Sequence, residues 1–320
     1  MDFQILISNI TNPTLLFFIL GVLAVIVKSD LEIPPTSVKF ISLYLLFAIG
    51  FKGGQELAHS GFSTELLHSL LFGLAVAAIV PLYTFFILKR KLSISDAAAV
   101  AAAYGSVSAV TFVSGVSFLE SQSVAFNGHM VAVMAMMEAP AIIVAVVLLR
   151  SYEKEQTNGH GLKATVRHSF TNGSVLLILG SLLIGMIADT KQAEGIKPFT
   201  TDIFKGFLAI FLLEMGMVTA KRISVFKKYG WFATLFAIVI PILNGSIVAI
   251  LSGTITESVG NRLIFALLAA SASYIAVPAA MRLSAPKADP GLFIPMALGI
   301  TFPINITIGM PFYYMIVTNT

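Results

Sequence analysis

Apolar residues run along the chain in ten stretches separated by short polar breaks. The stretches cover residues 14–27, 36–51, 63–88, 95–118, 124–150, 174–188, 203–220, 231–253, 261–283 and 291–317. A helix needs about 20 predominantly apolar residues to cross the hydrocarbon core of a membrane. The pattern therefore predicts an all-α polytopic membrane protein with ten transmembrane helices. The first stretch is expected to be a span rather than a removable signal peptide, since no basic segment precedes it. Ser93-x-x-Asp96 predicts the start of the fourth helix.

The composition agrees with this architecture and excludes several classes of protein. Of 320 residues, 57% are hydrophobic and only 11% are charged, whereas soluble domains carry about 25% charged residues. The absence of cysteine excludes disulfides, thiol catalysis and iron–sulfur clusters. The five histidines show no metal-ligand spacing, and no aspartate lies deep in a stretch. We therefore expect no catalytic residues, no metal site and no enzyme, an intramembrane protease included.

The distribution of basic residues predicts the orientation. Fifteen of the twenty lysines and arginines fall in the loops after the odd-numbered stretches. Basic loops stay on the cytoplasmic side, so both termini are expected outside the cytoplasm, in a plasma or bacterial inner membrane. We attribute the net charge of +4 to the basic loops on the cytoplasmic side. We therefore expect the protein to contact membrane lipid rather than nucleic acid.

The second half of the chain repeats short segments of the first half in the same order. The proline in AAIVPL, Pro81, corresponds to Pro241 in AIVIPI, and Pro140 corresponds to Pro303; the offsets of all the matches lie between 159 and 167. Five spans per half would make the second half enter the membrane from the opposite side. The sequence therefore predicts a 5+5 inverted-topology repeat, with halves at 1–150 and 174–320 and a cytoplasmic linker at 151–173. Such repeats are typical of secondary transporters, whose substrates bind near the midplane at broken helices.

Small and hydroxyl residues in the middle of the fourth and ninth stretches mark the expected breaks. Glycine permits unwinding there, and proline removes a backbone donor. The N-termini of half-helices, with their free N–H groups and partial positive charge, suit a small anion. The alternative is helix–helix packing, the usual use of small residues in membrane bundles. The candidate substrate-binding residues are Gly105, Ser106, Val107, Ser108, Thr111, Ser271, Ala272, Ser273 and Tyr274.

Glu138 and Glu214 are the acids that lie well inside apolar stretches. Carboxylates inside a membrane are costly and often bind cations or carry protons. We select Glu138, together with Ser108 and Ser273, as the candidate cation site. A structural, hydrogen-bonded glutamate is the alternative.

These residues also carry a family resemblance. The matching segments keep their order along the chain and include Gly53-Gly54, Asp96-Ala97, Gly105-x-Val107-Ser108-x-x-Thr111, Leu119-Glu120, Glu138-Ala139-Pro140, Met215-Gly216-Met217, Ser271-x-Ser273, and Pro278 with Arg282. The chain resembles the cyanobacterial sodium-dependent bicarbonate transporters. That resemblance implies import of bicarbonate with sodium as the coupling ion, assembly as a homotrimer, and a PII-like regulatory protein docking on the cytoplasmic face.

The chain also departs from the pattern of these transporters. Tyr274 stands where the pattern has an aspartate, and Glu138 takes the place of another aspartate. Sodium, proton or no ion therefore stay open as the coupled species. Two further functions stay open as well: a small organic carboxylate symporter of bile-acid-symporter-like architecture, and a non-coupled anion channel or sensor.

Overall fold

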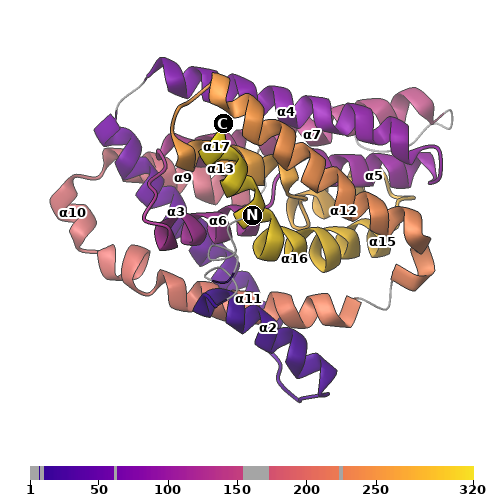
Figure 1. Ribbon diagram of the computed structural model, residues 1–320, viewed down its shortest axis with the longest axis horizontal. Helices are drawn as coiled ribbons and strands as arrows, with labels where there is room; N and C mark the ends of the chain where they lie inside the picture. Colours follow the sequence, from indigo (N-terminus) through magenta and orange to yellow (C-terminus); the bar gives the residue numbers. More distant parts are fainter. Residues whose placement is uncertain (1–6, 8–10, 61–62, 154–172, 223–225) are drawn as a thin grey trace.

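The computed structural model describes residues 7, 11–60, 63–153, 173–222 and 226–320, which are helical with short connections and no strand (Figure 1). Most of the predicted linker at 151–173 lies outside the described residues. The helices are α2 (Pro13–Ile26), α3 (Pro35–Ser60), α4 (Thr64–Leu88), α5 (Ile94–Gly105), α6 (Ala109–Ser121), α7 (His129–Tyr152), α9 (Gly173–Ile187), α10 (Thr190–Glu194), η1 (Pro198–Asp202), α11 (Phe204–Arg222), α12 (Phe226–Leu251), η3 (Ser252–Thr254), α13 (Val259–Ala270), α14 (Ala276–Ser284), α15 (Pro290–Met296), η4 (Ala297–Thr301), α16 (Phe302–Ile304), η5 (Asn305–Gly309) and α17 (Met310–Asn319).

Seven helical segments among the described residues are long and apolar enough to cross a membrane. They are Pro35–His59, Thr64–Leu88, Ile94–Ser121, His129–Tyr152, Pro198–Lys221, Gly230–Thr254 and Pro290–Asn319. Three shorter apolar helices accompany them, namely Pro13–Ile26, Gly173–Ile187 and Val259–Ala270. The prediction of an all-α polytopic membrane protein is confirmed, while the count of ten spans in a 5+5 repeat stays a prediction.

Polar residues in the breaks cap several helix starts. The Asn12 side chain accepts a hydrogen bond from the Thr14 amide at 3.0 Å, with Pro13 in the first turn of α2. The Ser93 hydroxyl accepts a hydrogen bond from the Asp96 amide at 3.0 Å. These caps satisfy amide groups that no preceding turn can bond. The start signal predicted at Ser93-x-x-Asp96 is therefore confirmed.

The helices pack in two groups. In the first group, α2 packs on α11 and α3 packs on α9. In the second group, α4, α5 and α7 pack together, as do α12, α13 and α17. Close packing in the first group depends on glycine: a Cβ atom added at Gly216 of α11 would strike the Phe18 carbonyl oxygen of α2. Likewise, a Cβ atom at Gly54 of α3 would strike the Leu182 carbonyl oxygen of α9. Glycine allows this close approach of backbones, as is common between membrane helices.

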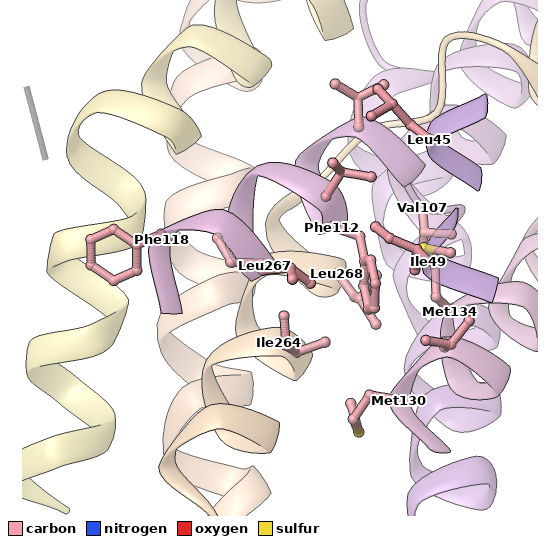
Figure 2. Close-up of a cluster of buried hydrophobic side chains, with 14 of the residues drawn as sticks. Leu45, Ile49, Val107, Phe112, Phe118, Met130, Met134, Ile264, Leu267 and Leu268 are labelled. Carbon is pink, nitrogen blue, oxygen red and sulfur yellow. The ribbon is translucent and has the colours of Figure 1, made fainter. Parts of the chain in front are cut away.

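Helix α6 lies in the largest buried apolar cluster, between the two groups. Figure 2 shows Phe112 of α6 lying between Leu268 of α13 and Ile49 of α3. Met134 of α7 closes the cluster from a further side. Every side chain of α6 from Val110 to Leu119 is buried. The part of the fourth apolar stretch that forms α6 is therefore enclosed by protein rather than lipid.

The last apolar stretch contains two π-helical turns, η4 and η5, within the helical run from α15 to α17. Pro303 follows η4 and Pro311 follows η5. Proline lacks the N–H that bonds the carbonyl four residues earlier, and its ring clashes with that carbonyl. Such turns often occur at functional positions, and here they contain Thr301 and Asn305, both fully or almost fully buried.

Candidate functional site

The fourth and ninth apolar stretches are each interrupted where the small and hydroxyl residues lie. Helix α5 ends at Gly105 and α6 begins at Ala109, with Ser106 and Ser108 in extended conformation between them. Helix α13 ends at Ala270 and α14 begins at Ala276, with Ser271 extended at φ −84° and ψ 168°. The extended backbone is buried among protein side chains, the condition under which irregular backbone is tolerated at membrane depth.

The two interruptions contact each other directly. The Ser108 amide donates a hydrogen bond to the Ser271 hydroxyl oxygen at 2.9 Å. The Ser273 amide donates to the Ala103 carbonyl oxygen at 2.8 Å. Both contacts join the two segments that the sequence pairs across the proposed repeat. The structure therefore brings the two predicted segments together at one place.

Two of the predicted hydroxyls are occupied by structural bonds. The Ser108 hydroxyl accepts a hydrogen bond from the Thr111 amide at 3.2 Å and so caps α6. The Ser271 hydroxyl donates to the Leu268 carbonyl oxygen at 2.8 Å while it accepts from Ser108. Thr111 is buried in the first turn of α6. These three residues hold the interruptions in shape.

Other polar groups at the interruptions are buried and less fully bonded. The Ser106 hydroxyl has no partner among the described residues, and the Tyr274 hydroxyl lies beside the Ser108 side chain without a well-formed hydrogen bond. At the start of α14, Ile275 occupies the cap position and provides no side-chain cap. The first amides of a helix have no partner within the helix, so this end can donate to a ligand. An unpartnered hydroxyl and an uncapped helix N-terminus are groups that suit a small anion.

Gly105, Val107 and Ala272 contribute shape rather than polar groups. A Cβ atom at Gly105 would strike the ring of Pro81 in α4 and crowd Ala141 of α7. Val107 and Ala272 are both buried. Glycine at position 105 therefore serves close helix packing, as the alternative interpretation of the small residues expected, and it also precedes the interruption.

The candidate cation residues do not form one bonded cluster. Ser108 and Ser273 lie at the crossing, but Glu138 makes no hydrogen bond with any described residue. Glu138 lies on α7 three residues before Ala141, which faces Gly105. Residues three apart on a helix share a face, which puts Glu138 within about one turn of the crossing. Among the described residues, no three acidic, histidine or cysteine side chains gather as a metal site.

Polar residues of the last apolar stretch support the site, although they were not among the residues predicted for it. The Asn305 side-chain amide donates to the Ala270 carbonyl oxygen at 2.7 Å, at the end of α13. The Tyr104 and Thr301 hydroxyls are 2.8 Å apart, in the last turn of α5 before the interruption of the fourth stretch. The signal was present, since Thr301 and Asn305 lie on either side of Pro303 in an apolar run.

The fold and these helices define a polytopic membrane protein of the transporter class. The model of the Na+-dependent bicarbonate transporter superfamily matches residues 13–318. The chain belongs to this superfamily, and the match includes both interruptions and almost the whole sequence. The resemblance stated from the sequence is confirmed. No individual curated protein matches the chain significantly.

Proposed function

We propose that the protein is a secondary active transporter that imports bicarbonate, or an anion of similar size, together with sodium by alternating access. The observation that carries this proposal is the contact between two interrupted helices, where the Ser106 hydroxyl has no partner among the described residues and the start of α14 has no side-chain cap. An oxyanion offers several acceptor oxygens to such a set of donors. Membership of the bicarbonate transporter superfamily supports the choice of anion.

The packing of the first helix group supports the inverted repeat within this proposal. The repeat pairs Gly50 with Gly216. A Cβ atom at Gly50 would strike Ile178 and Ser181 of α9, while one at Gly216 would strike Phe18 of α2. Each glycine therefore packs on the first helix of the other half. Two halves related in this way can exchange conformations, which would expose the crossing to one side and then to the other.

The coupling ion, the assembly and the partner complete the proposal. Sodium would bind near the crossing, with Ser108, Ser273 and Glu138 contributing oxygen ligands. A homotrimer and a PII-like protein on the cytoplasmic face follow from the family resemblance.

Uptake of labelled bicarbonate into proteoliposomes, with and without an inward sodium gradient, tests the function. We expect uptake that the gradient drives above equilibrium. Absence of uptake under both conditions would exclude bicarbonate, and uptake indifferent to sodium would exclude the coupling ion. Equilibration without accumulation would identify a channel instead.

A matched pair of serine variants tests the site. Ser106→Ala removes an unpartnered hydroxyl at the crossing, and Ser69→Ala removes an unpartnered, fully buried hydroxyl of α4. Ser69 is 12 residues before Pro81, the α4 residue that faces the crossing, which is about 18 Å along a helix. We expect a raised KM for bicarbonate in Ser106→Ala alone. Equal KM values in the two variants would contradict the assignment.

Tyr274 favours a second substrate class. Its ring packs against Phe302 with centroids 6.4 Å apart, so an aromatic surface borders the crossing. A small organic carboxylate could place its apolar end against this surface. Inhibition of bicarbonate uptake by acetate or pyruvate at concentrations below those of bicarbonate would favour the carboxylate transporter.

A further inference from the structure

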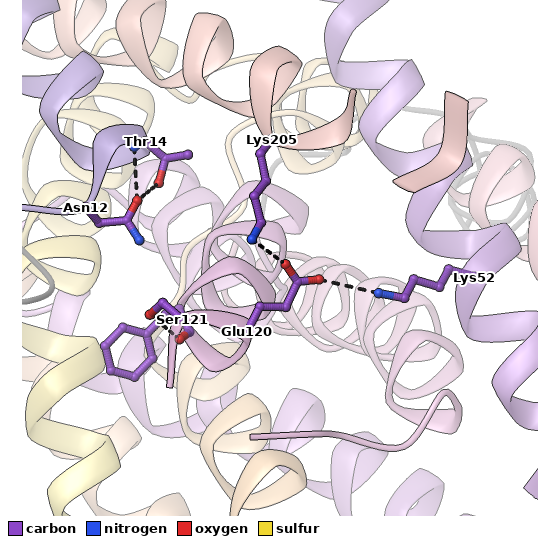
Figure 3. A network of polar contacts seen from close by, with 7 residues as sticks. Asn12, Thr14, Lys52, Glu120, Ser121 and Lys205 are labelled. Carbon is purple, nitrogen blue, oxygen red and sulfur yellow. Dashed lines mark hydrogen bonds and ion pairs between the residues drawn. The ribbon is translucent and has the colours of Figure 1, made fainter. Parts of the chain in front are cut away.

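Three charged side chains meet at the far end of α6 from the interruption. The Glu120 carboxylate lies between two lysines, with Lys52 Nζ at 3.4 Å from one oxygen and Lys205 Nζ at 3.1 Å from the other. Figure 3 shows the two lysines approaching the carboxylate from opposite sides. We call Lys52, Glu120 and Lys205 the ion triad.

The ion triad joins α6 to the first helix group. Glu120 lies in the last turn of α6, the helix that follows the interrupted segment at Ser106–Ser108. Lys52 lies on α3 and Lys205 on α11, both in the first helix group. A carboxylate on the helix that follows the interruption is therefore held by two cations of the neighbouring helices.

The ion triad borders a cavity of about 260 Å³ between these helices. Ala48 and Ile49 of α3 form one side, Val116 of α6 another, and Thr200 and Phe204 a third. Ala48 is only 1% exposed although it lines the cavity. The cavity lies along the last two turns of α6, at the Glu120 end.

The other half of the repeat has no equivalent acid. The pairing of α6 with α14 places Glu120 opposite residues 285–287, which are Ala, Pro and Lys. Lys287 instead pairs with Glu153 at 3.2 Å, at the end of α7. That ion pair joins the end of α7 to the connection between α14 and α15 and does not involve the first helix group. The acid that bonds to the first helix group is therefore a feature of one end of the molecule.

We propose that the ion triad is a gate that holds α6 against α3 and α11 and restricts access through the cavity to Ala48. This inference rests on the alternating access of the proposed function. In the conformation of the structure the restriction lies at the Glu120 end, which the basic loops predict to be outside the cytoplasm.

The strength of the ion triad suits a gate that must open in every transport cycle. The side chains are between 35% and 58% exposed, and exposed ion pairs are weak and are screened by salt. Two such pairs bias a conformational equilibrium by about fivefold rather than locking it. The bias can thus be overcome when substrate binds.

The chain is suited to a direct test because it contains no cysteine. An Ala48→Cys protein in lipid nanodiscs, where both faces meet solvent, would be labelled with an uncharged, water-soluble maleimide. We expect the additional change Glu120→Gln to raise the labelling rate about fivefold, from the strength of two exposed pairs. The matched control is Glu194→Gln, which removes an exposed acid on α10 outside the ion triad.

A salt series distinguishes an opened gate from a misfolded variant. Raising the salt concentration should accelerate labelling of the Ala48→Cys protein but not of the Glu120→Gln variant, because only the former has pairs to screen. Equal labelling rates with and without Glu120→Gln would overturn the gate. Labelling needs no substrate. The experiment therefore tests whether the ion triad restricts access to position 48 even if the protein does not transport bicarbonate.

Discussion

The hydrogen bond between the two interruptions provides the sharpest test of the site. The Ser271 hydroxyl accepts the Ser108 amide at 2.9 Å and donates to the Leu268 carbonyl oxygen at 2.8 Å, and the residue is 1% exposed. Ser271→Ala removes the acceptor while leaving space for no more than a small void. The amide of Ser108 would then be buried without a partner.

Ser252 provides a control for the local hydrogen bond that Ser271 makes to its own helix. Ser252 is fully buried, and its hydroxyl donates to the carbonyl oxygen of Ala249, three residues earlier, at 3.1 Å. Ser271 makes the same local bond to Leu268, and it alone also accepts an amide from the other interruption. The difference between Ser271→Ala and Ser252→Ala therefore isolates the bond that joins the two halves.

The expected magnitude follows from the burial of that amide. Leaving a buried donor unsatisfied costs about 1–3 kcal/mol, whereas side-chain hydrogen bonds in membrane proteins average about 0.6 kcal/mol and reach about 1.7 kcal/mol. The crossing is enclosed by protein, so the upper part of the membrane range applies. We expect Ser271→Ala to lose about 1–2 kcal/mol more free energy of unfolding than Ser252→Ala.

Unfolding in mixed micelles with increasing dodecyl sulfate, followed by circular dichroism, measures this difference. Ser271→Thr keeps the hydroxyl and should recover most of the loss. Equal destabilisation by Ser271→Ala and Ser252→Ala would refute the argument that this bond holds the crossing together.

Four further outcomes are expected. Gly216→Ala should destabilise the protein in the same titration because its Cβ would strike the backbone of α2, while Gly206→Ala, in open space on the same helix, should be neutral or stabilise by up to about 1 kcal/mol. Asn305→Leu should cost about 1–3 kcal/mol, since it leaves the carbonyl that ends α13 without a donor; no loss would contradict its capping role. Tyr274→Asp should increase the sodium dependence of bicarbonate uptake, and an unchanged dependence would separate this position from the cation. Glu138→Gln should reduce sodium-driven accumulation, whereas unaltered accumulation would remove Glu138 from the coupling site.

The helices were largely predictable because membrane spans must be long and apolar. The observed bounds of α4, Thr64–Leu88, differ by one residue from the predicted stretch, 63–88. The second stretch was predicted too short, at 36–51, while α3 continues to Ser60. Gly53 and Gly54 and the polar residues after them ended the apolar pattern there. Those glycines serve packing instead, since Gly54 meets the backbone of α9 and Gly53 faces Val131 of α7.

The site was predictable only in part because its members act through distant partners. Hydroxyl and small residues marked Ser106–Ser108 and Ser271–Ser273, and the structure brings these segments together. The support from Asn305 and the pairing of Glu120 with Lys52 and Lys205 depend on tertiary contacts. No local spacing reveals such contacts in a single sequence.

Tyr274 shifts the electrostatic balance of the crossing toward its donors. Where the resembling transporters have an aspartate, this chain has a neutral phenol whose buried hydroxyl lies beside the Ser108 side chain. Sodium favours anionic oxygen ligands, and bicarbonate favours donors. Replacing a carboxylate by a phenol therefore weakens the site for the cation and keeps it suitable for the anion. Glu138 is the candidate acid that remains, and it lies on α7 about one helical turn from Ala141, the residue that faces Gly105. If sodium drives transport in this protein, its charge must be balanced by Glu138 or by the bicarbonate itself. In the second case the two ions would bind as a neutral pair, and each would raise the affinity of the protein for the other by the same factor.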